Sequence, residues 1–319
     1  MAIFQIFGNH RISLFIRNAV FYTVAIFVSV SCEYNMELDK YEQPPKLFLD
    51  CIAGFNDSTV VKVMAATPIN KLPGEFDVEK VNLRMTVNGK AVDLSKKHTP
   101  MYRNLYWYSD VRYKPGDKVV IDASLDGITP IHAETVIPTE SPQATVKVFG
   151  QSEDLQDIYV SLKFDSGKTR YYAMRVFQTV RYYNPIIERD VSNTQQMFYL
   201  NDKVNYINDH NNRDCILFWD TTEYDSGEFD VKLSTYSQIV NTTGVKSVEY
   251  NVMLYNMTEE YFKYLLSLTR NDNGSSTGSD FLYNTMSAYT NVDNGLGILA
   301  GVNTIKSNAL HDGDVMEIR

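Results

Sequence analysis

The sequence predicts a mostly β protein with two β-rich domains, the first an immunoglobulin-like β-sandwich and the second carrying one covering helix. Short apolar segments that alternate with polar residues recur along most of the chain, with turn residues between them. Twenty-two tyrosines and 16 phenylalanines stand against 16 glycines, and half-buried sheet surfaces favour aromatic side chains. One segment stands out with the three-and-four apolar spacing of an amphipathic helix.

Residues 1–31 predict a signal peptide. They carry Arg11 and Arg17 and no acid, followed by an apolar core over 19–28 and then the small residues at 29–31. A membrane-spanning helix needs about 20 apolar residues, and this core is shorter. We therefore expect export and cleavage rather than a membrane span.

Cys32 directly follows these small residues, and this arrangement resembles the lipobox of bacterial lipoproteins. The resemblance implies that signal peptidase II leaves Cys32 as the first residue and that its thiol and amine are acylated. Ser29 departs from the usual box, which has leucine there. Several acyl chains anchor far more firmly than one. The alternatives are an uncleaved anchor helix, or a plain signal peptide with Cys32 as an ordinary thiol.

Residues 32–45 are polar and end in two prolines, which predicts a lipidated tether. Without residues 1–31, which hold two of the 30 basic residues and no acid, the net charge changes from −9 to −11. Nucleic acids need clustered Lys and Arg, so this acidic balance argues against a nucleic-acid partner. Cys51 and Cys215 are flanked by apolar residues, and we expect buried small side chains there. The sequence leaves open whether they pair.

The immunoglobulin-like sandwich is predicted over residues 46–138. Asn88-Gly89 is the strongest hairpin dipeptide, and the Cys–Trp–Cys spacing of antibody domains is absent. The expected strands cover residues 46–52, 59–65, 81–87, 90–92, 106–108, 118–123 and 132–137.

A linker over residues 139–144 is expected to lead into a β-rich C-terminal domain over 145–319. The expected strands there cover residues 145–149, 157–164, 170–177, 215–219, 229–233 and 247–255. Thr258 is the predicted N-cap of a helix that covers a sheet, with acids in its first turn and apolar residues at helical spacing. The apolar positions are Tyr261, Tyr264, Leu265 and Leu268. Residues 271–280 predict a mobile polar loop.

The chain resembles a known family over residues 45–301, and the C-terminal part carries the most specific residues. The residues from Tyr261 through the polar loop to Phe281, ending in residues 291–301, resemble the C-terminal signature of an uncharacterised family of Bacteroidetes cell-envelope lipoproteins. The most specific part is Asn294-Gly295-Leu296-Gly297-Ile298. Residues 282–284 depart from the proline-phenylalanine pair that is common in the family. The resemblance implies no catalytic residue, because the family has no assigned chemistry, and its members are typically encoded beside TonB-dependent receptors.

No chemical motif in the chain predicts an enzyme, a metal site or a cofactor. Gly295, Gly297 and Gly301 precede a strand pattern rather than a helix, so we expect close backbone packing instead of phosphate binding. Residues 208–214 lack the glycine and the distal glutamate of a calcium loop, which favours a solvated hairpin loop. The histidines beyond the signal segment are scattered along the chain: His98, His132, His210 and His311.

The candidate binding surface is an aromatic cluster of Tyr102, Tyr106, Trp107 and Tyr108. Rigid aromatic side chains stack on sugars or anchor partner proteins. Strand alternation would bury Trp107 and turn Tyr106 and Tyr108 outward, or the reverse. Core filling with one exposed tyrosine face is the alternative to a ligand platform.

These features together lead to the hypothesis of a non-catalytic outer-membrane lipoprotein that is an accessory or ligand-capturing subunit of a TonB-dependent nutrient-uptake system. The expected partners are the outer membrane through the lipid on Cys32, on either face, a receptor barrel, and a glycan or peptide ligand. The alternative is a structural envelope protein such as a fimbrial anchor or tip adhesin, in which Lys96-Lys97 or Arg213 would be the cleavage sites. A hydrolase with an unrecognised carboxylate site is the third hypothesis.

Overall fold

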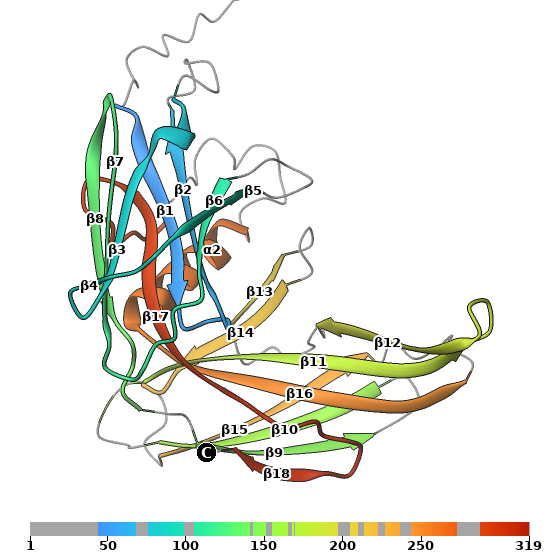
Figure 1. Ribbon diagram of the computed structural model, residues 1–319. Helices are drawn as coiled ribbons and strands as arrows, with labels where there is room; N and C mark the ends of the chain where they lie inside the picture. The colour runs from blue at the N-terminus through green and yellow to red at the C-terminus, as the bar shows by residue number, and fades with distance from the viewer. Residues whose placement is uncertain are drawn as a thin grey trace, which may run out of the picture. The chain divides into compact units, whose positions relative to one another are not determined.

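A computed structural model describes residues 44–67, 76–98, 105–140, 143–150, 155–164, 168, 170–196, 205–209, 214–222, 227–236, 244–272 and 288–318. The part of the chain from Pro44 onward forms one contact unit. It consists mostly of strands in several sheets, with a single α-helix in the described ranges, so the predicted fold class is confirmed (Figure 1). No helix in these ranges is long and apolar enough to span a membrane.

The largest sheet has ten strands and draws on both halves of the chain. Its strands are β1 (Lys46–Ala53), β2 (Thr59–Ala66), β5 (Ser95–His98), β6 (Leu105–Ser109), β11 (Tyr171–Asn184), β12 (Arg189–Gln196), β13 (Asn205–Asp209), β14 (Asp214–Asp220), β16 (Val245–Met257) and β17 (Leu296–Lys306). Their order is β13-β14-β11-β16-β17-β1-β2-β6-β5, and β12 pairs with β11.

Two four-stranded sheets complete the described strands. One has the order β4-β3-β7-β8 and the other the order β15-β10-β9-β18. The first contains β3 (Asn82–Val87), β4 (Lys90–Ala91), β7 (Lys118–Leu125) and β8 (Ile128–Val136), and the second contains β9 (Gln143–Gly150), β10 (Leu155–Lys163), β15 (Glu228–Tyr236) and β18 (Val315–Ile318). Asn88 and Gly89 both have positive φ between β3 and β4, as the predicted hairpin requires.

Three buried clusters hold these layers together. The first lies between β1, β2 and β6 of the large sheet and the sheet of β3, β7 and β8, and includes Leu49, Trp107 and Ile121. The second lies between β11, β14 and β16 and the sheet of β9, β10 and β15, and includes Trp219. The third lies under the helix α2 (Glu259–Asp272), which covers the other face of the large sheet through Phe262, as predicted.

The strand β17 connects the two predicted domains. It pairs in parallel with β1, from Phe48 opposite Leu296 to Ala53 opposite Gly301, and antiparallel with β16. Leu299 of β17 also lies in the first core. The strand beside β1 therefore comes from the C-terminal part of the chain, and independent folding of residues 46–138 stays a prediction.

Two glycines of β17 allow neighbouring backbone to come so close that a side chain at either position would not fit. Gly297 has φ +94°, and a Cβ there would lie 1.9 Å from the backbone oxygen of Leu49. A Cβ on Gly301 would lie 2.9 Å from the backbone oxygen of Val136, at the end of β8. The expected role of these glycines in close backbone packing is confirmed.

Gly297→Ala should lower the free energy of unfolding by about 3 kcal/mol or more, because the added Cβ meets backbone that cannot rotate away. Gly89→Ala is the matched control, since Gly89 also has positive φ but no atom lies within 4 Å of its Cβ position. That variant should lose only about 1 kcal/mol, the cost of the backbone conformation. Urea unfolding followed by circular dichroism measures both values, and equal losses would show that the contact with Leu49 does not matter.

The predicted domain boundary can be tested with two fragments. We expect residues 44–140 alone to unfold cooperatively, and the same fragment with residues 288–306 joined through a Gly/Ser linker to be more stable, because β17 then pairs with β1. Urea denaturation with two spectroscopic probes measures both. A cooperative transition only in the joined fragment would make β17 part of the first domain.

Candidate functional site

The predicted aromatic surface divides between the two faces of β6. Trp107 is only 3% exposed and lies in the first core, whereas Tyr106 and Tyr108 are half-buried on the opposite face. The first of the two predicted alternations is therefore confirmed, and Trp107 contributes no exposed surface. Tyr102 lies outside the described residues.

Both the ring and the hydroxyl of Tyr108 have partners within the protein. The ammonium of Lys97 on β5 lies 3.8 Å from the centre of the Tyr108 ring, and the hydroxyl donates a hydrogen bond to Asp110. This hydrogen bond raises the pKa of Tyr108. A ring covered by a cation offers little open face for stacking on a sugar. A binding role for Tyr106 and Tyr108 stays a prediction.

The other residues considered from the sequence lie apart from one another. Cys51 is a buried free thiol whose pKa is raised by burial, which keeps it unreactive. His98 contacts Glu79, His132 contacts Asp122, and His311 contacts the carbonyl of Val248. In the described ranges no group of three His, Cys, Asp or Glu side chains could hold a metal ion. Cys32, His210 and residues 273–280 lie outside these ranges, while Asn271 and Asp272 end α2.

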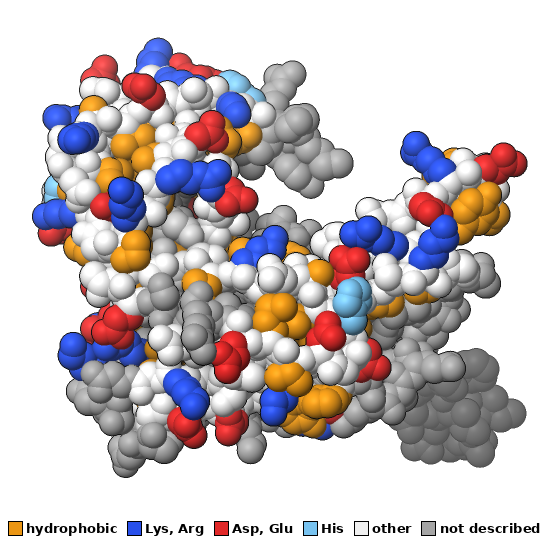
Figure 2. Space-filling model, turned by 60° about the horizontal axis from the view of Figure 1, so that its bottom comes forward, with side chains coloured by type: hydrophobic (Ala, Val, Ile, Leu, Met, Phe, Trp, Pro, Cys, Tyr) orange, Lys and Arg blue, Asp and Glu red, His pale blue; other side chains and the backbone are white. Residues whose placement is uncertain are grey.

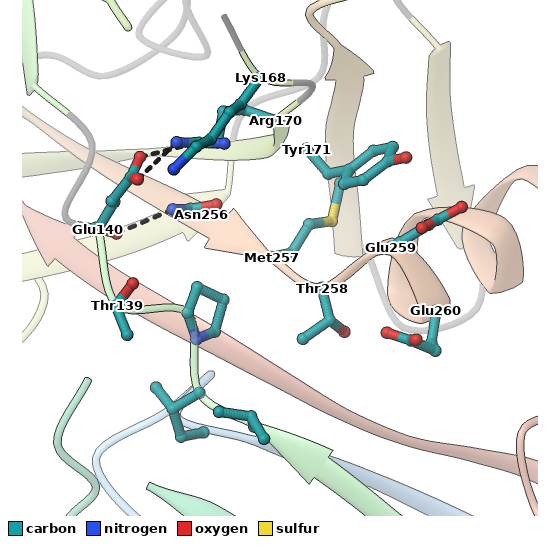
Figure 3. A pocket seen from close by; sticks show the side chains of 13 residues that line it. Thr139, Glu140, Lys168, Arg170, Tyr171, Asn256, Met257, Thr258, Glu259 and Glu260 are labelled. Carbon is teal, nitrogen blue, oxygen red and sulfur yellow. Dashed lines mark hydrogen bonds and ion pairs between the residues drawn. The ribbon is translucent and has the colours of Figure 1, made fainter. Parts of the chain in front are cut away.

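A cleft of about 480 Å³ lies where β8, β11 and α2 approach one another (Figure 3). Three segments line it. They are residues 136–140 after β8, residues 168, 170 and 171 at the start of β11, and residues 256–260 at the junction of β16 and α2. The first two residues of the predicted linker, Thr139 and Glu140, thus line this cleft.

One side of the cleft is fixed by a doubly bonded ion pair. The Arg170 guanidinium, 12% exposed, contacts the Glu140 carboxylate through Nε at 2.6 Å and through Nη2 at 2.5 Å. The Glu140 carbonyl oxygen accepts hydrogen bonds from the side-chain amides of Asn256 at 2.8 Å and Asn303 at 3.1 Å. Lys168 lies beside this pair in Figure 3. Two strands therefore hold this wall in place.

The start of α2 forms the opposite side. Glu259 contacts Lys263 at 2.7 Å, one turn along the helix, while Glu260 is the next residue of that turn. Burial, and after it the negative charge of Glu259, raise the pKa of Tyr171, so this phenol stays neutral. The acids lie in the first turn, where the helix dipole stabilises negative charge.

Thr258 occupies the predicted N-cap position, but its hydroxyl does not cap the helix. Its carbonyl accepts the hydrogen bond of Phe262 N–H at 3.2 Å, and its own N–H donates to the Gly301 carbonyl at 3.1 Å. Oγ1 of Thr258 is buried and has no hydrogen-bond partner among the described atoms. Buried polar atoms without partners are rare in folded proteins.

A second feature missed by sequence reasoning is the tip of the β11–β12 hairpin. Ile186 is 89% exposed and Ile187 is 47% exposed. The turn is fixed by Asn184, whose side-chain oxygen accepts from the N–H groups of Ile186 at 2.9 Å and Ile187 at 3.4 Å. Figure 1 shows this hairpin reaching beyond its neighbours, and Figure 2 shows hydrophobic side chains at its end between charged ones.

Comparison with known proteins identifies a family. The profile of a family described as "Domain of unknown function (DUF4249)" matches residues 32–307, which is most of the chain. A search of curated proteins found no match. The expectation of an uncharacterised family is confirmed. The chain belongs to the family of the domain of unknown function DUF4249.

Proposed function

We propose that this protein is a lipid-anchored subunit of a Bacteroidetes outer membrane that docks on a TonB-dependent receptor barrel and captures ligand for it, without catalysis. The lipobox-like residues before Cys32 support the anchor. Residues 33–43 separate Cys32 from the first described residue, Pro44, and eleven fully extended residues span at most about 40 Å. A chain acylated at Cys32 thus keeps its strand-rich body close to the membrane.

The observation that carries docking is the exposed tip with Ile186 and Ile187. Burying an aliphatic side chain of this size contributes about 1.5–3 kcal/mol, so a pocket that covers the tip gains binding free energy. The hairpin is already rigid, because β11 pairs with β12 from Phe177 to Asn184 and with β16 on its other side. Little conformational entropy is lost when such a tip docks.

A protein pocket suits this tip better than a lipid bilayer. Glu188 and Arg189 directly follow the isoleucines and would enter the hydrocarbon with them, which is costly. The flanking charges form ion pairs across the strands, Lys246 with Asp190 and Arg181 with Glu249. A pocket with an apolar centre and a polar rim matches this arrangement.

The anchor predicts that labelled palmitate enters the protein in its native host. Cys32→Ala should abolish the label, because acylation needs the thiol and the cleavage site. Cys51→Ala is the control, since that thiol is buried and should leave the label unchanged. Labelling is measured after purification in detergent. If the Cys32→Ala variant incorporates as much palmitate as the unchanged protein, the protein is not a lipoprotein anchored at Cys32.

Docking predicts that gentle extraction of cross-linked membranes recovers this protein together with a large outer-membrane barrel. Ile186→Ser with Ile187→Ser should weaken the complex about thirtyfold, since truncated interface anchors cost about 2 kcal/mol or more. The control is Val315→Ser, which removes an exposed apolar side chain from another sheet.

Tyr106→Ala with Tyr108→Ala tests the surface predicted from the sequence in the same assay. Loss of the barrel in this variant, with the isoleucine variant unaffected, would move the docking surface to β6. Recovery of the protein alone would argue against a receptor subunit and favour a structural envelope protein.

A further inference from the structure

Among the residues that the structure describes, one cation and one anion of the cleft have no ion-pair partner. Arg170 is paired with Glu140, and Glu259 is paired with Lys263. Lys168 and Glu260 form no ion pair with any residue that the structure describes, and both line the cleft. Figure 3 shows Lys168 on the side of Glu140 and Glu260 on the opposite side, with Met257 and Thr258 between them.

The space between these two charges has apolar walls. Ile137 and Met257 line it and are almost fully buried, and Pro138 lies beside Ile137. Thr258 also lines the cleft, with its hydroxyl oxygen buried. The cleft therefore offers a cation, an apolar middle and an anion.

We propose that this cleft binds a short peptide as a zwitterion, with the peptide carboxylate at Lys168 and its ammonium at Glu260. The volume of about 480 Å³ lies in the range of small-molecule sites. This proposal deepens ligand capture in the proposed function and rests on it, because it names the ligand class.

The same charges disfavour other ligands. A neutral sugar that covers Lys168 and Glu260 would leave both charges unpaired, which costs desolvation without compensation. A phosphate ester would bring its charge toward Glu259 and Glu260, which repel it. A molecule with one charge of each sign at its two ends satisfies both sides at once.

The test is calorimetric titration of the full chain in detergent with the tripeptide Ala-Leu-Ala. Acetylating the peptide amine or amidating its carboxylate should each weaken binding about fivefold, the loss expected for one partly screened charge contact. Lys168→Gln and Glu260→Gln should weaken binding of the free tripeptide by a similar factor. Lys147→Gln and Glu188→Gln are the controls, because both residues are exposed and lie outside the cleft.

The assignment of each end is tested by crossing the variants with the capped peptides. Glu260→Gln should not weaken binding of the acetylated peptide further, and Lys168→Gln should not weaken binding of the amidated peptide further. Additive losses in these crosses would overturn the assigned orientation.

Absence of heat up to about 10 mM peptide, or equal affinity of capped and free peptides, would overturn the proposal. Titration of the purified chain needs no receptor and recovery of the barrel needs no peptide, so the ligand class and the docking role can fail separately.

Discussion

The parallel pairing of β1 with β17 is the interaction on which the rest of the structure depends. It joins the first strand of the described chain to a strand almost 250 residues later, from Phe48 and Leu296 to Ala53 and Gly301. Because the backbones meet at Gly297 without room for a side chain, the register of the two strands is fixed at that point. Through β16, which pairs with the far edge of β17, the same register extends to β11 and the second core.

The cleft owes its shape to this strand. Gly301 of β17 lies against the end of β8 and accepts the hydrogen bond of Thr258 N–H, which places the start of α2 beside residues 136–140. Asn303, two residues further on, donates a hydrogen bond to the Glu140 carbonyl. The strand β17 thus contacts two of the three segments that line the cleft, residues 136–140 and 256–258. The third segment joins them through the ion pair of Arg170 with Glu140.

The spacing of apolar residues in the sequence predicted most strands and the helix. Each of these elements buries one face, so its apolar residues recur every second position in a strand and every third or fourth in a helix. The strands that sequence reasoning missed are β5, β12, β13 and β18. Each pairs with a single described strand, and all but β12 are five residues or shorter, so they carry little periodic signal. The cleft was missed for another reason. Lys168, Glu140 and Glu260 are ordinary surface charges in the sequence, and only the fold brings them to one place. The hairpin at Asn88 and Gly89 could be predicted without tertiary context, because its turn depends on local backbone conformation alone.

The position of β1 inside the large sheet has a mechanical consequence. Its chain neighbours toward the N-terminus lead to the proposed anchor, and both of its edges are hydrogen-bonded, to β2 on one side and to β17 on the other. A force applied along β1 from its N-terminal end would load both ladders in shear, so that many hydrogen bonds would have to break together. A terminal strand at a sheet edge would instead peel away one bond at a time. Pairing on both edges thus makes β1 resistant to a force along its own direction.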